Sequence, residues 1–115
     1  MTEAQAYAWL TVALYVLWVA GASSLAIMAS RHLIRHLHST DNPWGFTSKV
    51  LAGLAILGAG DAINRTFWGY WHLGKALGDS AMTAWVADHQ WINLAASVGI
   101  IVGYWIAALA LRRSS

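Results

Sequence analysis

Side chains that could do chemistry are concentrated between positions 61 and 72. Asp61, Arg65, Trp68 and His72 are separated by four, three and four residues, and Asn64 stands beside them. In a helix this spacing places them on one face, and Asp61 and Arg65 lie one turn apart, where they can form an ion pair. Such a polar stripe could line a lumen, serve a proton or quinone site, or join two helices. It is not expected to face lipid tails, because a charge at membrane depth costs several kcal/mol.

A structural interpretation of the polar stripe competes with the functional one. The helix can be offset along the membrane normal, so that Asp61 and Arg65 lie near the outer headgroups. The aromatic residues that follow, Phe67, Tyr70 and Trp71 among them, would then form the belt that aromatic side chains often make at membrane interfaces. We favour this interpretation, with the ion pair turned toward protein or headgroups.

Histidines are candidate ligands for a cofactor or a metal ion. His72 or His89 could bind a haem or pigment, but one axial histidine is not a motif. His32 and His36 lie one turn apart and could share a metal ion, but no third ligand or carboxylate stands at a suitable spacing nearby. We therefore expect no cofactor and no metal.

Motifs for catalysis are absent from the sequence. It has no phosphate-binding glycine loop, no HExxH and no nucleophile elbow. It also has no cysteine, which excludes disulfides, thiolate metal sites and cysteine catalysis. Its five carboxylates are scattered and form no paired acid and base. We expect a protein that is not an enzyme.

The composition is that of a membrane protein. Of 115 residues, 58% are hydrophobic and only 10% are charged. Eight tryptophans and four tyrosines are many for this length, and such residues collect at membrane interfaces. The formal charge of +2 is too small for a basic face that binds nucleic acid.

The pattern predicts an all-α fold, a single transmembrane domain over 1–115 with three membrane-spanning helices. They are expected at about 6–30, 49–71 and 90–111. The first is expected to continue as a basic helical extension over 31–38, and a short interfacial helix is expected at 80–87.

Boundary residues suggest where these helices begin and end. Asp41 or Asn42 before Pro43 is a good start for the second helix. Gly74 and Gly78 are expected to break that helix. Asp79 or Ser80 could cap the short interfacial helix, and Asp88 could cap the third span.

Small residues mark two helix faces suited to close packing. In the third span they recur at every fourth position: Ala95, Gly99, Gly103 and Ala107. This spacing keeps them near one face, where another backbone can approach closely. The first span carries a second small patch that includes Gly21 and Ser24. Both faces are interpreted as helix-packing surfaces.

Basic residues predict the orientation. Residues expected to face headgroups are Arg31, Arg35, Lys49, Arg112 and Arg113. All of them fall in the first connection or at the C-terminal end, and the N-terminal tail has no Lys or Arg. The positive-inside rule therefore places the N-terminus outside and the C-terminus in the cytoplasm.

Three function classes fit these features. The first is a non-catalytic accessory subunit of a larger membrane assembly, with the lipid bilayer and other transmembrane helices as its partners. The second follows from a likeness: in size, three spans, external N-terminus and basic C-terminal end, the chain resembles three-span phage holins. That resemblance implies oligomers that permeabilise a membrane. The third is a haem- or quinone-associated membrane anchor. The expected location is a bacterial-type inner membrane or a viral membrane.

Overall fold

A computed structural model of the protein describes residues 1–114, apart from the side chains of Arg113 and Ser114. This part of the chain is all helical, without a strand. Its four helices are α1 (Glu3–Ser39), α2 (Phe46–Leu77), α3 (Ser80–Asp88) and α4 (Gln90–Ser114). Three of them, α1, α2 and α4, are long and apolar enough to span a membrane.

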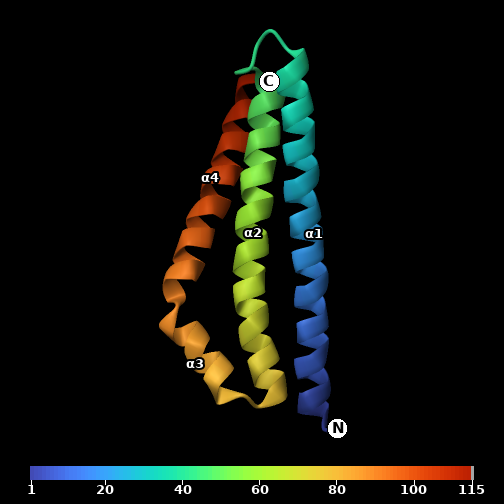
Figure 1. Ribbon diagram of the computed structural model, residues 1–115, viewed down its shortest axis with the longest axis vertical. Helices are drawn as coiled ribbons and strands as arrows, with labels where there is room; N and C mark the ends of the chain where they lie inside the picture. The colour runs from blue at the N-terminus through green and yellow to red at the C-terminus, as the bar shows by residue number, and fades with distance from the viewer. Residues whose placement is uncertain (115) are drawn as a thin grey trace.

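Helix α2 is the centre of the arrangement. It packs against α1 on one side and α4 on the other, and α3 lies against its C-terminal part (Figure 1). The molecule is elongated, with extents of 58 × 25 × 25 Å. The N-terminus and α3 are at one end, and the α1–α2 connection and the C-terminal end of α4 are at the other (Figure 1).

Local capping residues explain several helix ends. Thr2 and Gln5 form a capping box at the start of α1, in which each side chain accepts a bond from the other's backbone N–H. Asp79 caps α3 by accepting from the N–H groups of Ala81 and Met82. Gly78 ends α2 in the left-handed conformation, with φ of 68°, which glycine adopts without a Cβ clash.

Three expected boundaries are wrong. Helix α2 begins at Phe46 with Gly45 as its N-cap, because the Gly45 N–H bonds the Asn42 carbonyl in a turn that precedes the helix. Gly74 does not break α2. It is buried, and a Cβ there would lie 2.8 Å from the Met82 Cβ, so this glycine lets α3 approach. Asp88 is the last residue of α3 and not a cap of α4.

Glycines bring the long helices into close contact. A Cβ added at Gly58 would lie 2.8 Å from the Ala26 backbone nitrogen in α1. On the other side of α2, a Cβ at Gly53 would lie 2.9 Å from the Ala107 nitrogen, and one at Gly103 would lie 2.6 Å from the Leu57 nitrogen. Backbones therefore touch directly at both interfaces, as in closely packed transmembrane helices.

The small-residue row of α4 faces α2 only in part. Gly99 and Gly103 lie against α2, with Ala107 beside Gly53, but Ala95 is exposed and Ala96 is buried in its place. Four residues advance a helix by about 400°, so a row spaced by four drifts about 40° per step around the axis. The residues of α4 that contact α2 are therefore spaced by four from Gly99 to Ala107, but Ala96 precedes Gly99 by three.

The small patch of α1, which the sequence analysis interprets as a helix-packing surface, faces away from the other helices of the chain. Gly21 and Ser24 are exposed, and a Cβ added at Gly21 would meet no atom within 4 Å. The Ser24 hydroxyl donates to the Ala20 carbonyl one turn back, at 2.7 Å. Ala22 and Ala29 are the buried small residues of this helix.

Candidate functional site

The polar stripe of α2 divides between its two neighbouring helices. Asp61, Arg65 and His72 contact side chains of α1, whereas Asn64 and Trp68 contact α4. A single helical face was predicted, and the spacing of four, three and four does keep these residues close together. Helices α1 and α4 lie on either side of this face, and each contacts only the residues on its own side.

Asp61 joins a three-residue cluster with Arg65 and Trp18. The Arg65 Nε donates to Asp61 Oδ1 at 3.2 Å, and the Trp18 Nε1 donates to Asp61 Oδ2 at 2.9 Å. The Arg65 guanidinium carbon also lies 3.6 Å from the centroid of the Trp18 ring, which is a cation–π contact. The side chains of Arg65 and Asp61 are 27% and 24% exposed. Both carboxylate oxygens thus have donors, and the cation has a carboxylate and an aromatic face.

Asn93 of α4 completes the second cluster. Its Oδ1 accepts from the Asn64 Nδ2 at 2.7 Å and from the Trp68 Nε1 at 3.1 Å. Asn64 is only 6% exposed. A buried amide without a partner costs about 1–3 kcal/mol, so this pairing is needed for α4 to pack against α2.

Two residues missed by the sequence analysis, Trp18 and Asn93, hold these clusters together. The position of each residue in the sequence could have indicated a hydrogen bond to another helix. Trp18 is in the middle of the first apolar run, where a membrane-spanning helix would leave its indole N–H far from headgroups and in need of a protein partner. Asn93 is an amide within the third apolar run, and polar side chains in such helices commonly bond across to another helix.

The rings of His72 and His89, the candidate cofactor ligands, pack against aromatic rings. The His72 ring centroid lies 4.8 Å from that of Tyr15 and 5.0 Å from that of Trp71. The His89 ring stacks on Trp85 at 4.2 Å, and its Nδ1 is 2.6 Å from the Trp85 carbonyl oxygen. Within residues 1–114, no three His, Asp or Glu side chains come together as a metal site.

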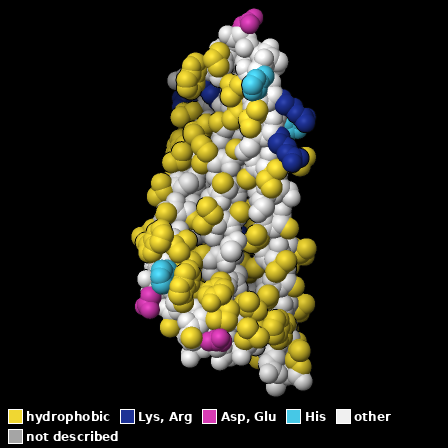
Figure 2. All heavy atoms as spheres, viewed as in Figure 1, with side chains coloured by type: hydrophobic (Ala, Val, Ile, Leu, Met, Phe, Trp, Pro, Cys, Tyr) yellow, Lys and Arg dark blue, Asp and Glu magenta, His cyan; other side chains and the backbone are white. Residues whose placement is uncertain are grey.

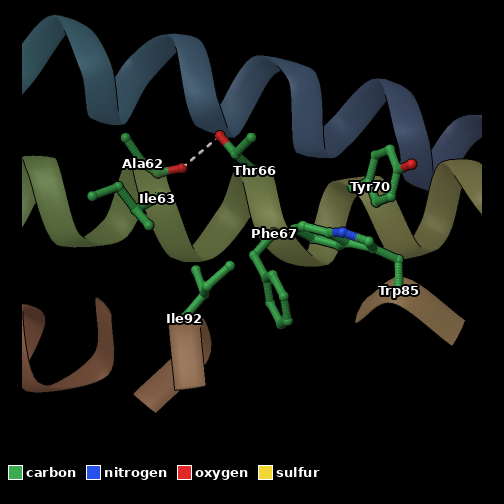
Figure 3. A pocket seen from close by; sticks show the side chains of 7 residues that line it. All are labelled: Ala62, Ile63, Thr66, Phe67, Tyr70, Trp85 and Ile92. Atoms are coloured by element: carbon green, nitrogen blue, oxygen red, sulfur yellow. Dashed lines mark hydrogen bonds between the residues drawn. The ribbon is translucent and has the colours of Figure 1, made fainter. Parts of the chain in front are cut away.

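A groove opens beside the clusters, between α2, α3 and α4. Phe67 and Tyr70 of α2, Trp85 of α3 and Ile92 of α4 line it, and its volume is about 500 Å³ (Figure 3). The only lining hydroxyl drawn with a bond is that of Thr66, which donates to the Ala62 carbonyl of its own helix (Figure 3). The groove is therefore lined mainly by apolar groups, with the Thr66 and Tyr70 hydroxyls among its few polar side-chain groups.

Basic side chains gather at the opposite end of the molecule, near the α1–α2 connection (Figure 2). Arg31, Arg35 and Arg112 are exposed, and Lys49 is half-buried. The side chain of Arg113 lies outside the described residues. Hydrophobic side chains cover much of the face between this end and the other (Figure 2).

Comparison of the chain with protein-family profiles, with curated proteins and with solved structures finds no match.

Proposed function

We propose that this protein is a non-catalytic subunit that spans a membrane three times and packs into a larger membrane assembly through the outward face of α1. The observation that carries the proposal is the position of Gly21 and Ser24. They form a small-residue notch on an exposed helix face, flanked by the exposed side chains of Leu17 and Met28.

The use of glycine elsewhere in the chain supports this interpretation of the notch. Gly53, Gly58 and Gly103 each lie where a neighbouring backbone comes within 3 Å of an added Cβ. Gly21 has no such neighbour, and a glycine inside a helix costs about 1 kcal/mol relative to alanine. A helix of another subunit, lying across Gly21, would give this glycine the same role as the others.

In the proposed membrane, the polar clusters would lie within the hydrocarbon core. The basic residues that close the three apolar runs at one end are Arg31, Lys49 and Arg112. A hydrocarbon core of about 30 Å covers about 20 helical residues, which sets the other boundary near Thr11, Gly69 and Ile92. Asp61 is then about 12 Å inside that boundary and Arg65 about 6 Å. Asp61 would then lie deeper than the headgroup interface where the sequence analysis expects it, and its pairing with Arg65 and Trp18 would offset the cost of that depth.

The internal pairing of these groups supports a subunit rather than a pore. A pore built from several copies needs polar side chains that face its lumen. Asp61, Arg65, Asn64 and Asn93 instead bond one another or an indole within the chain. On the face of α1 formed by Leu17, Gly21, Ser24 and Met28, only Ser24 is polar, and its hydroxyl bonds the Ala20 carbonyl of its own helix. It suits contact with another apolar helix.

Assembly of variants in mild detergent tests the proposal. Gly21→Leu should abolish or strongly weaken association while leaving the folded chain intact, because the added side chain meets no atom of its own chain. Ala108→Leu adds the same side chain to an exposed position of α4 and serves as the matched control. Equal association of both variants and the unmodified chain would contradict the proposal.

A further inference from the structure

We propose that the first turn of α2 binds the phosphate group of an anionic phospholipid, with an acyl chain of that lipid in the groove between α1 and α4. This groove, here called the basic-end groove, has a volume of about 670 Å³. Its floor includes Ser48, Lys49 and Ala52 of α2, and its walls include Leu33 of α1 and Ile106 of α4. The volume is within the range of about 300–1,000 Å³ that ligand sites occupy.

The start of α2 offers unsatisfied donors for an anion. Its N-cap is Gly45, which has no side chain to bond the first amides. The Lys49 N–H bonds the Gly45 carbonyl, but the amides of Phe46, Thr47 and Ser48 precede the first bond of the helix. Three free N–H groups and the positive end of the helix dipole favour a phosphate oxygen.

Ser48 provides a second and independent indication of a ligand. It lines the basic-end groove and is 4% exposed, and its hydroxyl has no hydrogen-bond partner. Three helical hydroxyls elsewhere in the chain are satisfied locally: those of Thr11, Ser24 and Thr66 each donate to the carbonyl four residues before. Ser48 makes no such bond, because the residue four before it, Trp44, precedes the helix. A rotation about its Cα–Cβ bond can direct the hydroxyl to a phosphate.

Charge and polarity along the groove match a phospholipid from headgroup to acyl chain. Lys49, the residue after Ser48, lines the same groove and supplies a cation. Ala52 is one turn further along α2, and the walls of the groove are aliphatic at Leu33 and Ile106. Anionic lipids are enriched in the cytoplasmic leaflet, which is where the positive-inside rule places this end. This inference rests on the membrane placement proposed above.

Lipid retention by the purified full chain tests the inference. The protein in detergent is mixed with phosphatidylglycerol or with phosphatidylcholine of the same acyl chains, and native mass spectrometry measures how many lipids stay bound. We expect one phosphatidylglycerol to be retained in preference to phosphatidylcholine. Lys49→Gln should weaken this retention about fivefold, the effect of about 1 kcal/mol for one cation at an anionic lipid surface. Ser48→Ala should weaken it in the same direction.

Arg31→Gln is the matched control, since it removes one charge at the same end from an exposed position that does not line the groove. Equal loss for Arg31→Gln and Lys49→Gln, or equal retention of the two lipids, would overturn the inference. Displacement of phosphatidylglycerol by inorganic phosphate alone would overturn the lipid assignment and indicate a site for free phosphate. A separate experiment tests the membrane placement itself. If alkaline carbonate extracts the chain from membranes, the chain does not span them, whatever its lipid retention in detergent.

Discussion

The ion pair between Asp61 and Arg65 should show strong energetic coupling. Breaking a buried pair by removing one partner costs about 3–5 kcal/mol. Each side chain here is about one quarter exposed, so the lower end of that range, about 3 kcal/mol, is expected for Asp61→Ala. This change leaves the guanidinium without its carboxylate and also leaves the Trp18 N–H without an acceptor.

Arg65→Ala should cost less, about 2 kcal/mol, because Asp61 keeps its bond from the Trp18 indole. The double change to alanine removes both charges together, so it should cost less than the Asp61→Ala change alone. The expected coupling energy is therefore between about 2 and 3 kcal/mol, at the upper end of the range of about 0.5–3 kcal/mol for residues in contact.

Unfolding in mixed micelles with an increasing fraction of a denaturing detergent, followed by circular dichroism, measures these free energies. Trp18→Phe is a useful companion, since it removes the indole N–H and keeps an aromatic ring beside Arg65. Additive losses for Asp61→Ala and Arg65→Ala, within about 0.5 kcal/mol, would show that the two residues do not interact and would refute this description of the cluster.

Further predictions concern the helix contacts and the orientation. Gly103→Ala should destabilise the fold by about 1–3 kcal/mol because its Cβ would overlap the Leu57 backbone, whereas Gly99→Ala should be neutral, since its nearest neighbour lies at 3.7 Å; the same unfolding assay compares them. Asn93→Leu should cost about 1–3 kcal/mol for each group it leaves unpaired, and adding Asn64→Leu should recover part of the loss. Reporter fusions at both ends should place the N-terminus outside and the C-terminus in the cytoplasm, and a cytoplasmic N-terminus would contradict the charge argument.

The three long helices could be predicted from the sequence because long apolar runs have few other stable structures in a membrane. Asp79 as a cap of the short helix was similarly predictable, since the capping bond is local. The start of α2 was not, because a turn from Asn42 to Gly45 competes with the helix that Pro43 would otherwise begin. Gly74 was misjudged because its role depends on α3, a separate element.

The polar stripe shows a second limit of the sequence. The period of a helix tells which residues share a face, so the closeness of Asp61 and Arg65 was predictable. The partners on the neighbouring helices were not, because the sequence of α2 contains no information on how α1 and α4 are shifted along it. Trp18 and Asn93 reach their partners only in the observed register. The same limit applies to Ala95, whose exposure follows from the drift of a four-residue spacing around α4.

Cross-linking at position 21 tests most directly whether the outward face of α1 is an assembly surface. The chain has no cysteine, so Gly21→Cys introduces a single thiol. Ile27→Cys is the control, because Ile27 is also exposed but lies about 240° around the helix from Gly21. Oxidation in native membranes should give a covalent product with a second copy or another membrane protein for Gly21→Cys, and little for Ile27→Cys. Equal yields from both positions, or no product from Gly21→Cys, would contradict the proposed function.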